Sequence, residues 1–232
     1  MEKSKKSRRK KLILWLCIDA VAAATVILLL LYKPARYHPM TPPVAEDPNG
    51  RQVHPYITHD LMPTLYNKAQ EQQPFEMELL GQSLNEAIAQ TGWRQESGGI
   101  RLSSPAIAFA PGRVILMGTA DIEGAGFVVT IEIGPQILPD GRLNLAVKKV
   151  SIGAMNLTWP AKMLAEKKYR EQVDAGLVDT QDWRTKIAAS LLAGEPFDPV
   201  FPVEDKWIRL ESFDIGQDKA TIRFVPAPKK SK

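Results

Sequence analysis

Cysteine and histidine are both scarce in this chain of 232 residues. The single cysteine is Cys17, and the three histidines are His38, His54 and His59. One cysteine makes no disulfide within the chain and no cysteine cluster for a metal. His54 and His59 are five residues apart, which is not the i, i+4 spacing of a helical zinc pair. The sequence therefore predicts neither a disulfide framework nor a metal site, and no cofactor is expected.

Catalytic sequence motifs are missing as well. There is no G-x-S-x-G nucleophile elbow and no Walker sequence. The pair Gly124 and Gly126 lacks the third glycine and the following helix of a dinucleotide-binding loop. Asp121 and Glu123 are two apart, so they share a strand face, but they flank a glycine-rich turn where solvated acids are common. We therefore expect a protein that is not an enzyme, with an envelope hydrolase as the least favoured alternative.

Basic residues are concentrated at one end of the chain. The formal net charge is +4, yet seven lysines and arginines lie within the first twelve residues, and the remainder has a slight excess of acid. A nucleic-acid-binding domain carries a basic patch or stripe on its folded surface. We therefore expect no nucleic-acid partner.

A long apolar segment follows that basic tail. The run from Leu12 to Tyr32 spans ~30 Å as a helix, which matches the hydrocarbon core of a bilayer. Secretory signals have a shorter apolar region. Cleavage after the small residues Ala22, Ala23 and Ala24 is the alternative, but it would leave an apolar stub. The segment predicts an uncleaved signal anchor that contacts the lipid bilayer through residues 12–32.

The charges around this segment predict its orientation. Basic residues precede it, and only Lys33 and Arg36 follow closely, so the N-terminus is expected in the cytoplasm. The chain would cross the cytoplasmic membrane once, with its domain outside or in the periplasm. Asp19 lies inside the apolar run, where a charge is costly. It is either a contact to another membrane helix or a protonated or snorkelling side chain.

The rest of the chain divides by composition. Six prolines between residues 33 and 55 predict an extended linker that holds the domain clear of the membrane or lets it bend back. The expected organisation is a cytoplasmic basic tail, the membrane anchor, the linker, one external domain and a second basic tail, at residues 1–11, 12–32, 33–55, 56–226 and 227–232.

Two hydrophobic periodicities alternate in the external domain. Apolar residues at helical spacing, with Thr58 and Thr180 as expected N-caps, predict helices at 58–72, 83–90, from 158, and 180–193, the last ended by Gly194. Strict alternation predicts strands at 75–79, 107–109, 114–120, 127–133, 143–147, 207–213 and 221–225, with a bulge or twist at Lys148-Lys149. We expect an α+β fold: a twisted, mostly antiparallel meander with helices packed on one face, preceded by one transmembrane helix.

Three stretches together are similar to a known family. They are "GQSLNEAIAQTGW", "FAPGRVILMGTADIEG" and "LPDGRLNLAVKKVSIGAMNLTWPAKML". In this order, behind an N-terminal anchor, they resemble the YpmS-like family of membrane-anchored bacterial proteins, over roughly residues 75–170. A fainter similarity is to tubular lipid-binding domains. This fainter resemblance implies a groove for an amphiphile and no catalytic residues.

Large apolar side chains after the meander are candidates for such a groove. They are either its lining or ordinary core, and we name them as Trp159, Met163, Trp183, Phe197 and Phe201. The expected function is binding a lipid or other amphiphile in envelope maintenance. The alternative is a scaffold that docks an envelope protein complex through the domain and the membrane helix, with Asp19 in the helix contact.

Overall fold

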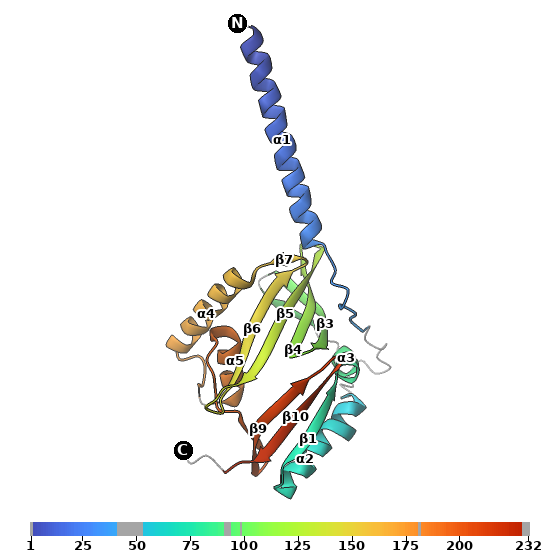
Figure 1. Cartoon of the computed structure of the whole chain (residues 1–232), viewed down its shortest axis with the longest axis vertical. Coiled ribbons are helices and arrows are strands. Elements are labelled where there is room, and N and C mark those ends of the chain that lie inside the picture. Colours follow the sequence, from blue (N-terminus) through green and yellow to red (C-terminus); the bar gives the residue numbers. More distant parts are fainter. Residues whose placement is uncertain (1, 41–52, 91–93, 98, 181, 229–232) are drawn as a thin grey trace.

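A long N-terminal helix projects from a domain built of strands and short helices. The computed structural model describes residues 2–40, 53–90, 94–97, 99–180 and 182–228. The helix is α1 (Glu2–Leu30), and Figure 1 shows it standing away from the domain. Its window Ile13–Leu30 has a mean hydropathy of 2.5 and is not buried by the domain. α1 is therefore long and apolar enough to cross a membrane.

The strands form two antiparallel sheets. The four-stranded sheet has the order β1-β10-β9-β8, and the six-stranded sheet runs β2-β3-β4-β5-β6-β7. The expected α+β class is confirmed, but the strands divide between two sheets. The strands are β1 (Phe75–Leu80), β2 (Arg94–Ser97), β3 (Ile100–Ala110), β4 (Arg113–Ile122), β5 (Ala125–Ile137), β6 (Leu143–Ile152), β7 (Met155–Asn156), β8 (Val200–Val203), β9 (Lys206–Ile215) and β10 (Lys219–Pro226).

One face of the four-stranded sheet is covered by a helix. A π-helical turn, η1 (Tyr56–Leu61), leads into α2 (Met62–Glu71), and Leu65 and Ala69 of α2 pack on a core that contains Phe75 and Phe224. The helix thus begins earlier than expected. Thr58 is not its N-cap, because it lies within η1, where its hydroxyl donates to the His54 carbonyl at 3.5 Å.

The six-stranded sheet is a meander of hairpins with one register shift where the sequence indicates it. Glu132 pairs with Lys149, and Ile133 pairs with Val147, so Lys148 is the additional residue of a bulge. Because of the bulge, Val147 and Val150 of β6 both pair with apolar residues on one face of β5, although they are three positions apart. The expectation of a bulge or twist at this point is confirmed.

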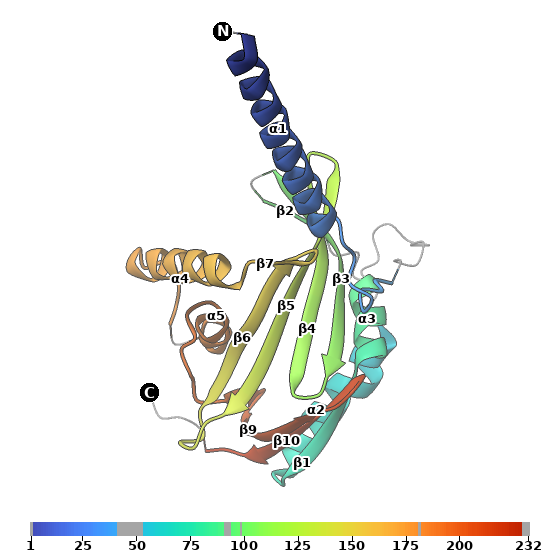
Figure 2. The ribbon, with the colours of Figure 1, turned by 45° about the horizontal axis from the view of Figure 1, so that its top comes forward.

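Short helices lie at the two outer edges of this meander. They are α3 (Gly81–Gln90), α4 (Thr158–Asp174) and α5 (Trp183–Ala193). Figure 2 shows α3 beside β3 and α5 beside β6, at opposite edges. Asp182, not Thr180, caps α5, since its carboxylate accepts from the Arg184 amide. Gly194, with φ of 71°, ends α5 as expected.

Side chains of these helices bond backbone groups of β3 and β6 that the short edge strands β2 and β7 leave unpaired. The Asn85 amide of α3 donates to the Ile107 carbonyl and accepts from the Ile107 amide, both at 2.7 Å. On the other edge, the Ser190 hydroxyl of α5 accepts from the Leu145 amide at 2.8 Å, and Thr158 of α4 accepts from the Val150 amide at 2.9 Å. Unpaired backbone groups at a sheet edge can pair with another chain. These side-chain hydrogen bonds occupy such groups at Ile107, Leu145 and Val150.

The end of α1 is joined directly to the domain. The Ala154 amide, in the turn between β6 and β7, donates to the Leu29 carbonyl at 2.8 Å. Gly153 precedes it with φ of 57°, and a Cβ there would collide with the carbonyls of Leu29 and Leu30. Tyr37 then packs on the meander, where its hydroxyl donates to the Ser104 carbonyl at 2.8 Å. Residues 41–52 of the expected linker and 229–232 of the expected C-terminal tail lie outside the described residues.

Candidate functional site

An uninterrupted row of apolar side chains crosses one face of the meander. Ile107 of β3 pairs with Leu116 of β4, Leu116 pairs with Ile131 of β5, and Ile131 pairs with Val150 of β6. Directly paired residues bring their Cβ atoms to about 4.5–5.5 Å, so the four side chains form a continuous strip. All four remain half-buried, which means that the strip is only partly covered.

A glycine makes this apolar face hollow beside that strip. Gly118 stands in the interior of β4, paired with Val129 of β5 on the same face. The space above it, with Ile88 of α3 as one wall, is a pocket of about 300 Å³. We call it the sheet groove; it is lined by Ile88, Leu102, Ser103, Pro105, Ala106, Ile107, Leu116, Met117, Gly118, Val129 and Ile131. Small-molecule sites are typically apolar and about 300–1,000 Å³ in volume.

One end of the sheet groove lies close to the end of α1. Val129, in the lining, pairs directly with Ile152, the last residue of β6. The next residue, Gly153, begins the turn that contacts the carbonyl groups of Leu29 and Leu30. The apolar lining therefore begins within a few residues of the membrane-length helix.

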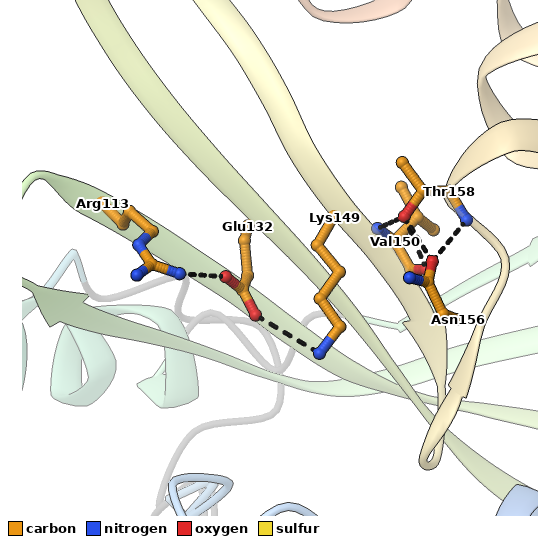
Figure 3. Close-up of polar contacts among 6 residues, drawn as sticks. All are labelled: Arg113, Glu132, Lys149, Val150, Asn156 and Thr158. Atoms are coloured by element: carbon orange, nitrogen blue, oxygen red, sulfur yellow. Dashed lines mark hydrogen bonds and ion pairs between the residues drawn. The ribbon is translucent and has the colours of Figure 1, made fainter.

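The opposite face of the meander carries an ion-pair row beside the buried Ile115 and Met117. The Glu132 carboxylate lies 2.9 Å from the Arg113 guanidinium and 3.8 Å from the Lys149 ammonium, in a row across β4, β5 and β6 (Figure 3). The Glu132 side chain is only 16% exposed, so the two cations compensate a carboxylate that the sheet partly desolvates. This arrangement is an ion-pair row that holds neighbouring strands.

Two other hollows lie away from the meander face. One, of about 390 Å³, separates α4 from α5 and is lined by charges of both signs, among them Arg170, Lys186 and Glu195. Burial raises the pKa of Tyr169 in its wall, and the Glu195 carboxylate raises it further. The other, of about 700 Å³, lies between α2 and β8 and mixes apolar with polar side chains. Neither has the uniformly apolar lining of the sheet groove.

Three of the five large side chains expected to line a groove do come together. Trp183 and Phe201 are in edge-to-face contact with ring centroids 5.9 Å apart, and Phe197 and Phe201 meet the same way at 6.5 Å. Phe197 also exchanges both backbone hydrogen bonds with Leu143 of β6. This aromatic cluster joins α5, β8 and β6, so it packs the two sheets together outside the sheet groove.

The other two lie on the surface of α4. Trp159 is 73% exposed and Met163 is 54% exposed, and neither lines the sheet groove. Asp19, the candidate for a contact between membrane helices, lies on α1 within the window that the domain leaves exposed. The five expected groove residues therefore separate into an aromatic cluster, in which Phe197 is buried, and an exposed pair on α4.

Most residues of the sheet groove lie in the predicted strands 107–109, 114–120 and 127–133, and Ile88 lies in a predicted helix. No element is predicted for the stretch from Leu102 to Ala106. Phe127, Val129, Ile131 and Ile133 were correctly placed on one face, as their pairing with Ala120, Gly118, Leu116 and Val114 confirms. The signal for a hollow was Gly118, because glycine inside a strand often marks a site of close approach by a ligand or another chain.

Asp121, one of the two paired acids of the β4–β5 turn, has a structural role. The Asp121 carboxylate accepts from the Gly124 amide at 3.1 Å and so stabilises the β4–β5 turn. Within the described residues, no group of three or more histidine, cysteine, aspartate or glutamate side chains is arranged to hold a metal ion.

Comparisons with known proteins add no evidence about the function of this chain. No family model, curated protein or solved structure matches this chain. The resemblance to the YpmS-like family therefore stays a prediction.

Proposed function

We propose that this protein is anchored in the cytoplasmic membrane by α1 and binds the apolar tail of a lipid or similar amphiphile in the sheet groove. The observation that carries the proposal is the half-buried row Ile107, Leu116 and Ile131 across a sheet whose helices contact its edges. Apolar surface of this kind gains about 25 cal/mol for each Å² that a ligand removes from water.

The position of the groove favours a ligand that comes from the membrane. Its lining reaches Val129, whose partner Ile152 immediately precedes the turn bonded to Leu29. The volume of about 300 Å³ is at the small end of ligand sites, which favours one tail over a complete two-tailed lipid. The excess of basic residues in the first turns of α1, ahead of its apolar segment, supports a cytoplasmic N-terminus and a domain outside the cell or in the periplasm.

Gly118→Val is the variant that tests this proposal most directly. A Cβ at Gly118 would meet only the Ser103 carbonyl, at the ordinary distance of 3.6 Å. Valine also favours strands, so the variant should fold at least as stably as the wild type while it fills the hollow. Gly126→Val is the matched control, because Gly126 is a strand glycine in β5 that pairs with Asp121 of β4 and does not line the groove.

The measurement is crosslinking of a single-tailed phospholipid that carries a diazirine on its acyl chain. The full chain would be reconstituted in lipid nanodiscs, irradiated with the probe and mapped by peptide mass spectrometry. We expect crosslinks on β3, β4 and β5 that Gly118→Val removes and Gly126→Val keeps, with crosslinks on α1 in all three proteins. Crosslinks confined to α1 would contradict the groove and leave the alternative of a protein-docking scaffold.

A further inference from the structure

The first half of α4 presents large apolar side chains to solvent. Trp159, Met163 and Leu164 are 73%, 54% and 58% exposed. Trp159 and Met163 are four residues apart and lie one above the other on one side of the helix, and Leu164 lies ~100° further round the helix axis. Tyr169 is the residue that α4 buries, and the described residues of the domain leave these three side chains exposed.

The path of the chain fixes this surface close to α1. The Ala154 amide binds the Leu29 carbonyl, and α4 begins only four residues later, at Thr158. In both ribbon views α4 starts beside β7, at the end of the domain from which α1 leaves (Figures 1 and 2). Leu29 is three residues before the end of the apolar run, or ~4.5 Å along a helix, so the turn lies near the boundary of the hydrocarbon core.

Local hydrogen bonds hold the start of α4 in this position. The Thr158 hydroxyl accepts from the Val150 amide at 2.9 Å, and the Asn156 side chain accepts from the Thr158 amide at 3.0 Å (Figure 3). The start of α4 is thereby attached to β6, the strand that leads to Gly153. The direction of α4 is set by the same sheet that contacts α1.

Exposed lysines near this surface could interact with the phosphate groups of lipids. Lys162 is exposed in the first half of α4, and Lys167 and Lys168 are exposed just beyond it. The nearby acids Glu166 and Glu171 form ion pairs with Arg170 and Lys167. Helices that lie in the interface of a bilayer combine tryptophan or leucine on one side with lysines that reach lipid phosphates. Tryptophan in particular is enriched at the level of the headgroups.

From these observations we propose that the first half of α4 lies in the interface of the bilayer that α1 crosses, with Trp159, Met163 and Leu164 inserted among the lipids. The proposal rests on α1 being a membrane anchor, which is part of the function proposed above. It adds a second membrane contact, and two contacts hold the domain in a fixed orientation on the membrane surface.

The test uses three labels in the full chain, reconstituted in vesicles of phosphatidylcholine with a minority of phosphatidylglycerol. The environment-sensitive fluorophore NBD is attached to the native Cys17, or to Met163→Cys or Leu177→Cys in a Cys17→Ser chain. Leu177 is the matched control, since it is 77% exposed but follows the far end of α4. We expect blue-shifted emission and quenching by doxyl-labelled lipid at positions 17 and 163, and neither at position 177.

A second variant shows whether the signal at position 163 depends on the apolar surface of α4 or on the fluorophore alone. Trp159→Asp in the Met163→Cys chain should abolish the blue shift and the quenching at position 163. Glu166→Asp in the same chain, a change away from the apolar side chains, should leave both in place.

Each other outcome identifies which part has failed. A quenched label at 17 with an unquenched one at 163 overturns the interfacial role of α4 and leaves the anchor intact. No quenching at 17 overturns the anchor and this inference with it. Equal quenching at 163 and 177 shows no preference for the first half of α4, and a blue shift at 163 without lipid quenching indicates a protein partner; both overturn the proposal.

Discussion

The two sheets of this domain use helices in different ways. The four-stranded sheet has α2 across its apolar face, so Phe75, Phe224 and Ile208 are at most 7% exposed. The six-stranded sheet has helices at its edges, bonded through Asn85, Thr158 and Ser190, and the centre of its apolar face stays half-buried. A helix placed on a face completes a core, whereas a helix placed at an edge leaves a surface that a ligand can cover.

The largest expected effect tests the covered sheet. Phe224→Ala removes a ring stacked on Phe75, with centroids 5.4 Å apart, from the core under α2. We expect a loss of about 3–5 kcal/mol in the free energy of unfolding, as for other buried phenylalanines. Urea denaturation of the full chain in detergent micelles, followed by tryptophan fluorescence, gives this value. A loss below about 1.5 kcal/mol would mean that the face under α2 is not a tightly packed core.

The second prediction concerns the edges of the meander. Asn85→Ala leaves both the amide and the carbonyl of Ile107 without their side-chain partner. We expect a loss of about 2–3 kcal/mol, because each half-buried group loses a hydrogen bond. Asn67→Ala on the exposed surface of α2 is the matched control and should change stability by less than about 0.5 kcal/mol. Equal effects from the two substitutions would show that α3 is not needed to close the edge.

The third prediction tests the open face. Leu116→Ala removes a side chain from the floor of the sheet groove, where it is already half-exposed. We expect a loss of only about 1 kcal/mol in the absence of a ligand, well below that of a buried leucine. The same denaturation measurement checks it. A loss above about 3 kcal/mol would place Leu116 in a closed core and argue against a ligand site.

The sequence predicts local elements better than it predicts what covers them. Alternation in 127–133 located β5 and its apolar face, and the change of parity at Lys148-Lys149 located the bulge, because both depend on neighbouring residues. The edge contacts of Asn85 and Ser190 join residues 22 and 45 positions apart, and no local pattern predicts them. Trp159 and Met163 were grouped with Trp183 by composition, yet only the packing of α4 decides that they are exposed.

The smallest expected effect concerns how α2 is held over its sheet. The Gln70 side chain of α2 donates to the Asp205 carboxylate at 3.1 Å, in the turn between β8 and β9. This hydrogen bond, followed by that of Lys206, lowers the pKa of Asp205 from its usual 3.8. A lowered pKa means that the ionised carboxylate stabilises the folded chain above the unfolded value, and that this contribution is lost as pH falls through the folded value.

Asp205→Asn keeps an acceptor for Gln70 but removes the charge. We therefore expect the difference in urea midpoint between wild type and variant to be constant near neutral pH and to shrink below pH 3.8. The carboxylate is exposed, so solvent screens it and the difference stays small at every pH. A difference independent of pH would mean that the Gln70 contact does not depend on the charge of Asp205, and that apolar packing alone holds α2 on the four-stranded sheet.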